Sequence, residues 1–209
     1  MSDDARTDFS IKPTLVGERV LLRPFRMDQT DDSALRSLLR DPEVGRLTGS
    51  SHGSADHETW DEAAEARMQA WYSTRHEQTD RLDLAVVERA TGVCVGEVVL
   101  NEWDSGNRSC NFRIAFAPAG QGRGLGTEAV RLIVGHGFER LGLHRISLGV
   151  YAFNPRAQRA YEKAGFVVEG VRRDVLLHEG EWVDEIVMSV LPPEWRRHRG
   201  HPEAAFRGE

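Results

Sequence analysis

The sequence contains little cysteine. Only two cysteines, Cys94 and Cys110, occur among the 209 residues, which is too few for a disulfide scaffold. Neither belongs to a Cys-x-x-Cys pair or to a cluster of cysteine and histidine, and no two histidines show His-x-x-x-His spacing on an expected helix. We therefore expect both cysteines to be free thiols in a core, and we expect no metal site.

Long apolar segments and an excess of positive charge are also missing. No apolar run approaches the ~20 residues of a membrane-spanning helix, and the polar start Met1–Asp4 has no basic or apolar region of the kind that a signal peptide carries. The net charge is −6, from 27 Lys and Arg against 33 Asp and Glu. The sequence therefore predicts a cytoplasmic protein and disfavours membrane and nucleic-acid partners.

The composition is that of a globular chain. Apolar residues make up 40% and charged residues 29% of the sequence, and the length suits one domain with a single core. Residues 1–15 are polar and have no apolar period, so we expect a flexible N-terminal segment. Residues 192–209 have no strand or helix pattern and predict a flexible C-terminal tail. The domain is expected to span residues 16–191.

The middle of the chain alternates apolar and polar residues between turns. This pattern predicts strands at 82–86, 93–100 and 110–116 that form an antiparallel meander. The other expected elements are a strand at 19–24, a helix at 33–40 stopped by Pro42, a helix within 57–72, a helix that follows Gly120 to Gly126 and reaches about residue 140, a strand at 145–150, a helix at 155–164, and strands at 167–171 and 182–191.

A glycine-rich segment, Gln121–Thr127, stands between an expected strand and an expected helix. Its three glycines let the backbone approach a ligand closely, and the first N–H groups of the helix point into the loop with the positive end of the helix dipole. Gly126 is followed by Thr127 and Glu128 rather than Lys-Ser/Thr, which excludes a nucleotide-binding P-loop. The segment predicts an anion site, and a plain structural loop is the alternative.

A second motif runs from Asn154 to Phe166. Asn154 can cap a helix, Pro155 suits its first turn and Gly165 suits the position after its end. Tyr161 shares one helix face with three alanines, which leaves space beside its ring. The alternative interpretation is a core aromatic residue whose hydroxyl group is hydrogen-bonded.

Together the two motifs resemble the GNAT superfamily of N-acetyltransferases. The resemblance rests on Gln-x-x-Gly-x-Gly at 121–126 and on Asn-x-x-Ala-x-x-x-Tyr-Glu-Lys-x-Gly-Phe at 154–166. Leu22-Arg23-Pro24 and Val168-Glu169-Gly170 favour the branch with ribosomal-protein N-terminal acetyltransferases and spermidine/spermine acetyltransferases. The resemblance to this superfamily implies an α+β fold, with a mixed, mostly antiparallel central sheet flanked by helices in three α/β/α layers.

The resemblance implies acetyl-CoA as the donor, with no metal. Pantetheine would add to the edge of a strand at Ile114, Ala115 and Phe116. The other implied donor-binding residues are Gln121, Gly122, Arg123, Gly124, Leu125, Gly126, Thr127, Asn154, Arg159 and Tyr161. For the two arginines, phosphate binding competes with the simpler role of a solvated surface charge.

The acceptor would be an amine that attacks the thioester directly, without a covalent enzyme intermediate. By resemblance, Tyr161 supplies the proton to the departing thiolate. Glu97 and Glu102 are the candidate bases, with a solvent-facing strand glutamate as the alternative for each. Glu102, Asn111 and Arg113 are the candidate acceptor-binding residues, and Asn111 replaces an acidic residue often found there, which weakens a polyamine assignment. His178 is a further candidate for contact with the acceptor.

Several functions remain compatible with the sequence. Another acyl group such as succinyl could be transferred on the same scaffold, or the chain could be a non-catalytic sensor module that binds CoA. The amine could belong to a protein N-terminus or to a small molecule such as a polyamine or an aminoglycoside. A homodimer is one assembly that the sequence allows.

Overall fold

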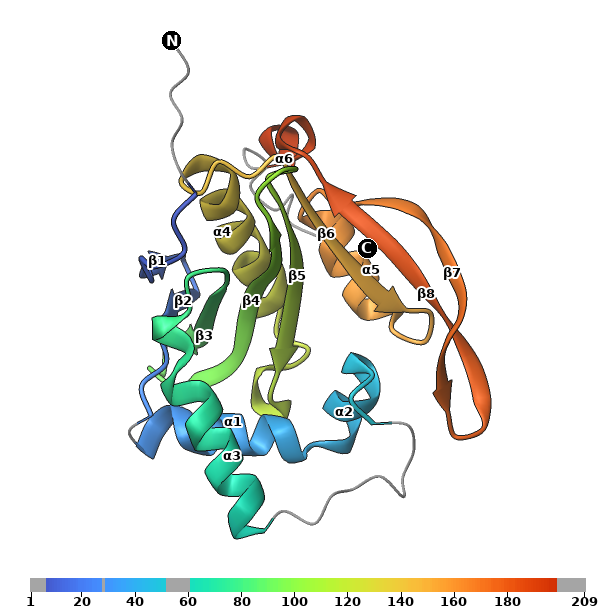
Figure 1. Cartoon of the computed structure of the whole chain (residues 1–209). Coiled ribbons are helices and arrows are strands. Elements are labelled where there is room, and N and C mark those ends of the chain that lie inside the picture. The colour runs from blue at the N-terminus through green and yellow to red at the C-terminus, as the bar shows by residue number, and fades with distance from the viewer. Residues whose placement is uncertain (1–6, 28, 52–60, 199–209) are drawn as a thin grey trace, which may run out of the picture.

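An eight-stranded sheet runs through the described part of the molecule, which comprises residues 7–27, 29–51 and 61–198 of the computed structural model (Figure 1). The strand order is β1-β2-β3-β4-β5-β6-β8-β7. The strands are β1 (Leu15–Val16), β2 (Val20–Arg23), β3 (Leu82–Glu88), β4 (Cys94–Asp104), β5 (Ser109–Phe116), β6 (Arg145–Tyr151), β7 (Val167–His178) and β8 (Glu181–Val190). Only β5 and β6 pair in parallel among these strands. The predicted mixed, mostly antiparallel sheet is confirmed.

Helices cover both faces of this sheet, which confirms the three-layer arrangement. Side chains that alternate along a strand point to opposite faces. On one face, Leu84, Val98 and Leu100 pack with helix α4 (Leu125–Glu139) and with Tyr161 of helix α5 (Pro155–Lys163). On the other face, Ala85 packs with helix α1 (Gln29–Arg40), which is accompanied by α2 (Pro42–Thr48) and α3 (Glu62–Ser73). Short 3-10 turns at Arg75–Glu77 and Pro118–Gly120 complete the described elements before the C-terminal helix.

The two central strands β5 and β6 separate along their length. Their parallel ladder covers only three residue pairs, from Ser109 with Arg145 to Asn111 with Ser147. Beyond this point residues 112–116 of β5 pair only with β4. The N–H and C=O groups on the side of β5 that faces β6 are therefore free of strand partners, in the middle of the sheet rather than at its edge.

Pro42 begins a helix in the structure, which corrects part of the prediction. The first helix ends at Arg40, as expected, but Asp41 then caps α2 by accepting a hydrogen bond from the Val44 N–H at 2.9 Å. Proline suits the first turn of a helix because the N–H that it lacks has no partner there. The reading of Pro42 as a stop signal alone therefore missed α2.

Residues 7–15 are packed against the sheet, so the predicted flexible N-terminal segment is wrong for them. Phe9 is 1% exposed and its ring lies 5.5 Å from that of Trp103. The Lys12 ammonium donates to the carbonyl oxygens of Phe9, Gln78 and Arg81 at 2.7, 2.6 and 2.7 Å. A short segment of low apolar content is held here by one aromatic ring and one ammonium group.

The predicted tail also contains a helix, α6 (Pro192–His198). Its Trp195 is buried and packs 5.8 Å from the ring of Phe138 on α4, which corrects the prediction for residues 192–198.

Strand β7 runs seven residues past the predicted end at 171. The predicted helix within 57–72 corresponds to α3 from Glu62, and its expected first residues lie outside the described ones. Cys94 and Cys110 are buried free thiols, as expected.

Candidate active site

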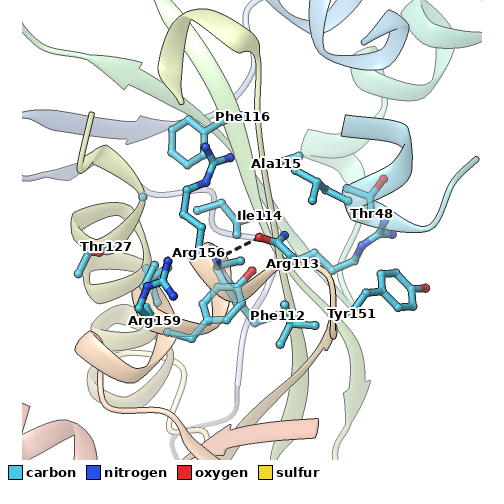
Figure 2. Close-up of a pocket in the computed structure, with 18 of the residues that line it drawn as sticks. Thr48, Phe112, Arg113, Ile114, Ala115, Phe116, Thr127, Tyr151, Arg156 and Arg159 are labelled. Atoms are coloured by element: carbon cyan, nitrogen blue, oxygen red, sulfur yellow. Dashed lines mark hydrogen bonds between the residues drawn. The ribbon is translucent and has the colours of Figure 1, made fainter. Parts of the chain in front are cut away.

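A cavity of about 720 Å³ occupies the space where β5 and β6 separate (Figure 2). Its lining comes from β5, β6, the start of α4, helix α5 and the end of α2. The predicted site residues found in this lining are Glu102, Asn111, Arg113, Ile114, Ala115, Phe116, Gln121, Gly122, Gly124, Leu125, Gly126, Thr127, Asn154, Arg159 and Tyr161. The fold thus brings together nearly all of them, from segments far apart in the sequence.

The glycine-rich segment forms one end of the cavity. Gly122 and Gly124 have φ of 70° and 75°, a left-handed conformation that side chains other than glycine rarely adopt. Gly124 is the N-cap of α4, and no side chain accepts a hydrogen bond at this cap. The first N–H groups of a helix have no partner within the helix, so those of α4 are available to an anion in the cavity.

Arg123 lies outside the cavity lining, contrary to its predicted place among the donor-binding residues. Its guanidinium group pairs with the carboxylate of Glu88, with Nη1 3.1 Å from Oε2, and also donates to the Ala119 carbonyl at 3.2 Å. The hydrogen bond from Arg123 lowers the pKa of Glu88. Arg123 therefore ties the glycine loop to strand β3.

Helix α5 carries cations that the sequence analysis only partly identified. Arg156, Arg159 and Lys163 line the cavity, and their spacing of three and four residues places them on one helix face. Arg156 donates to the Gln121 side chain at 3.1 Å, next to the glycines. Figure 2 shows Arg156 and Arg159 on the same side of the cavity. The helical spacing of Arg156 and Arg159 was the signal that could have identified Arg156.

Tyr161 of α5 lines the cavity. The residue is 8% exposed, and its ring packs edge-on to Phe112 at 6.1 Å and lies 5.9 Å from Phe166. Within the described residues the hydroxyl group has no hydrogen-bond partner, so the alternative interpretation of a core tyrosine with a bonded hydroxyl is not met. Burial raises the pKa of Tyr161, which keeps the phenol protonated at neutral pH.

Glu97, a predicted candidate base, lies outside the lining of this cavity. Its carboxylate accepts a hydrogen bond from the hydroxyl group of Tyr72 on α3 at 2.9 Å. Burial raises the pKa of Glu97, and burial together with the nearby carboxylate raises that of Tyr72. Of the two candidate bases, Glu97 and Glu102, only Glu102 lines the cavity.

Glu102 and Asn111 stand near the point where β5 and β6 part. Glu102 has φ of 53° at a register shift between β4 and β5, and it is exposed. The Asn111 side chain donates to the Asn101 side chain at 2.9 Å. Asn111 is thereby oriented by a neighbouring strand, and the bulge turns Glu102 toward the cavity.

The remaining wall of the cavity comes from residues that the sequence analysis did not select. Leu47 and Thr48 of α2, Tyr151 of β6, Arg172 of β7 and Glu185 of β8 contribute to the lining. They come from one helix near the N-terminus and three strands in the C-terminal part of the chain, and no local motif marks them.

Aromatic contacts hold this wall together. The Tyr151 ring lies 5.5 Å from that of Phe153, and the Arg46 guanidinium lies 4.6 Å above the Phe153 ring. His178 is not in the lining, and its Nδ1 lies 3.4 Å from the Ser51 carbonyl oxygen. It therefore belongs to the support of this wall rather than to the cavity surface.

Among the residues that the structure describes, no group of three or more His, Cys, Asp or Glu side chains could hold a metal ion. None of the helices in the same part of the chain is long and apolar enough to cross a bilayer.

Comparison with protein families matches residues 19–167 to the acetyltransferase (GNAT) domain. The chain is similar to the probable N-acetyltransferase YjcK of Bacillus subtilis, with 35% identity over 124 residues that cover 59% of this chain and 68% of that protein. It is also 30% identical over 141 residues to the spermidine N(1)-acetyltransferase of Vibrio cholerae, which covers 61% of this chain and 82% of the other. Proteins named for ribosomal acetylation are among the relatives too.

The fold has a counterpart among solved structures. The crystal structure of spermidine N-acetyltransferase from Vibrio cholerae in complex with CoA and spermine superposes with a TM-score of 0.71 at 24% identity, over 86% of this chain and 99% of the other. At this identity the similarity concerns the fold. Family and branch agree with the resemblance found in the sequence motifs.

Proposed function

This chain belongs to the GNAT family of N-acetyltransferases, and on that basis we propose that it transfers acetyl from acetyl-CoA to a primary amine by direct attack in a ternary complex. GNAT enzymes use acetyl-CoA. The observation that carries the proposal is the unpartnered hydroxyl group of Tyr161, in the same cavity as the uncapped start of α4.

The chemistry of one end of the cavity suits the pyrophosphate of CoA. The N–H groups at the start of α4 and the positive end of its dipole favour an anion. Arg156, Arg159 and Lys163 add positive charge along the same wall, and guanidinium groups form paired hydrogen bonds with phosphate oxygens. We propose Arg156 and Arg159, in place of Arg123, as the phosphate-binding arginines.

The unpaired side of β5 suits pantetheine. Residues 112–116 line the cavity with backbone groups that no strand partner uses on that side. An extended chain with amide groups can add to such a strand through main-chain hydrogen bonds. In this arrangement Ile114, Ala115 and Phe116 hold the donor, and a backbone N–H in this stretch is available to the thioester oxygen.

The donor supplies an acetyl thioester, from which a thiolate must leave with a proton. Tyr161 has that proton, because its raised pKa keeps the phenol neutral, and its hydroxyl group is not committed to another described residue. A proton donor within reach of the leaving group contributes typically 10²- to 10⁴-fold to the rate. We therefore assign Tyr161 as the general acid.

Deprotonation of the amine is the second requirement. An alkylammonium group has a pKa of about 10.4 and is mostly protonated at neutral pH. Glu102 lies in the cavity lining, whereas Glu97 has a carboxylate whose pKa is raised by burial. We propose Glu102 as the carboxylate that meets the ammonium group.

Two measurements test the proposed function. Calorimetric titration should give acetyl-CoA binding to the free protein, and initial rates with acetyl-CoA and an amine should give intersecting double-reciprocal lines, as direct transfer requires. Parallel lines would indicate a covalent acetyl-enzyme and contradict direct attack. Binding without acetylation of any amine would favour the sensor alternative, and faster turnover with succinyl-CoA would favour the other acyl donor.

A further inference from the structure

The side of the cavity opposite α5 has its own set of charges. Arg113 alternates with Phe112 and Ile114 along β5, so its side chain leaves the sheet on the face that α1 to α3 cover. In Figure 2 the Arg113 side chain extends toward Thr48 and Tyr151, whereas Arg156 and Arg159 lie across the cavity. A donor held at α4 and α5 leaves this second side for the acceptor.

Two carboxylates near this side have partners other than Arg113. The carboxylate of Glu185 pairs with Arg172, with Nε 2.6 Å from Oε2, and only 12% of the Glu185 side chain is exposed. The carboxylate of Glu97, two residue pairs along the sheet from Arg113, accepts a hydrogen bond from the Tyr72 hydroxyl group. Neither carboxylate forms an ion pair with Arg113.

Arg113 on this side, and Glu102 elsewhere in the cavity lining, have no hydrogen-bond or ion-pair partner among the described residues. Both line the cavity and both are exposed to it. A guanidinium group presents a planar fork that matches the two oxygens of a carboxylate or phosphate group. The part of the cavity away from α5 therefore offers the unpaired positive group of Arg113, and the lining also contains the unpaired carboxylate of Glu102.

We infer that the acceptor is an amine that also carries an anionic group, a carboxylate or a phosphate, which Arg113 binds while Glu102 faces the ammonium group. The inference rests on the proposed function and narrows its substrate class. It separates this chain from the spermidine acetyltransferases among its relatives, because a polyamine carries only positive charges and would bring one of them toward Arg113.

A matched panel of acceptors tests this selection. Each amine of two to four carbons is offered in four forms that differ only at the far end: carboxylate, phosphonate, alcohol and second amine. With saturating acetyl-CoA, the carboxylate or phosphonate form should have a kcat/KM at least tenfold above the alcohol and diamine forms. The anionic form with the higher kcat/KM identifies the preferred anion. Comparing peptide amides that carry an acidic side chain with the free small amines distinguishes a polypeptide acceptor from a small molecule.

Two variants of one residue make the test independent of the exact substrate. Arg113→Gln should lower kcat/KM for the anionic amine about 10- to 100-fold, as loss of a hydrogen bond to a charged group predicts, with an unchanged Kd for acetyl-CoA. Arg113→Glu should reverse the order and make the diamine the better substrate. Arg173→Glu makes the same change of charge at an exposed position of β7 outside the cavity and should leave the order unchanged.

The outcomes separate the inference from the proposed function. Acetylation of alcohol or diamine forms at equal or higher kcat/KM, or an unchanged order in Arg113→Glu, would overturn the inference and leave the acetyltransferase proposal intact. Failure of the protein to acetylate any amine would contradict both. A loss of acetyl-CoA affinity in Arg113→Gln would indicate that Arg113 binds the donor rather than the acceptor, and it would also overturn the inference.

Discussion

Each face of the sheet buries one tyrosine against the central strands, and the two residues are used differently. Tyr72 of α3 is 5% exposed and Tyr161 of α5 is 8% exposed, so both rings contribute to the apolar interior. The Tyr72 hydroxyl group donates to Glu97 at 2.9 Å. The Tyr161 hydroxyl group has no hydrogen-bond partner in the described part of the chain, and the residue lines the cavity.

This difference separates a tyrosine whose hydroxyl group is bonded within the fold from one whose hydroxyl group is free to contact a ligand. A buried hydroxyl group ordinarily finds a hydrogen-bond partner, because leaving it unpaired costs free energy. Tyr72 satisfies that requirement within the fold. At Tyr161, a ligand in the cavity would supply the missing hydrogen-bond partner. Four substitutions test this contrast between the two faces of the sheet.

The largest effect is expected at Tyr161. Tyr161→Phe keeps the ring packed between Phe112 and Phe166 but removes the proton donor. The value of kcat should fall roughly 10²-fold, while the free energy of unfolding changes by less than about 1 kcal/mol because no hydrogen bond within the fold is lost. Steady-state rates and thermal unfolding of the same preparation check both parts. A kcat within threefold of wild type would remove Tyr161 from catalysis.

The same substitution at Tyr72 should affect stability instead. Tyr72→Phe leaves the half-buried carboxylate of Glu97 without its donor, which should cost about 1.5 to 3 kcal/mol. Thermal unfolding should show a melting temperature lower by several degrees. The Kd for acetyl-CoA, whose proposed site includes α4 and α5 on the opposite face, should stay the same. An unchanged melting temperature would mean that the bond contributes nothing.

A charge placed at the start of α4 tests the anion site. Gly126 is in the first turn of the helix, and a Cβ there would lie 3.4 Å from the Phe116 ring, an ordinary contact. Aspartate is favourable in the first turn of a helix but repels phosphate. Gly126→Asp should therefore raise the acetyl-CoA Kd at least tenfold, about 1.4 kcal/mol, without lowering the melting temperature. Gly126→Asn is the matched neutral control, and equal affinities of the two variants would show that charge plays no part.

The smallest effect concerns the pH dependence of stability at Glu97. Because burial raises its pKa, the folded state holds this proton more tightly than the unfolded state, and the stability from protonation is lost as the pH rises above the ordinary glutamate range. Glu97→Gln stays neutral and can still accept the Tyr72 hydrogen bond. Its melting temperature relative to wild type should therefore be higher at pH 8 than at pH 5. A difference independent of pH would contradict the shift.

The donor side of the cavity could be predicted from the sequence because its signals are local. The left-handed glycines and the uncapped helix start are adjacent in the chain, and the Asn154 cap and Tyr161 lie on one short helix. Local backbone preferences and helix periodicity are what sequence patterns encode. The family motifs are built from the same local features.

The acceptor side could not be predicted in this way. Leu47, Thr48, Tyr151 and Glu185 meet through the packing of α2 against β5 and the pairing of β6 with β8. The bond between Tyr72 and Glu97 joins residues 25 positions apart, and the partner of Arg123 lies 35 positions away. Such contacts depend on tertiary packing, which local sequence patterns do not encode. The sequence therefore predicts functional roles for Arg123 and Glu97, although the side chain of each is bonded outside the cavity.

The central claim is that the unpaired hydroxyl group of Tyr161 serves the reaction, whereas the paired hydroxyl group of Tyr72 serves the fold. The most direct test is the ratio of kcat between Tyr72→Phe and Tyr161→Phe, measured on one amine at saturating acetyl-CoA together with both melting temperatures. The account predicts that the Tyr161 variant is at least about 30-fold slower and yet the more stable of the two. Equal values of kcat, or a less stable Tyr161 variant, would contradict it.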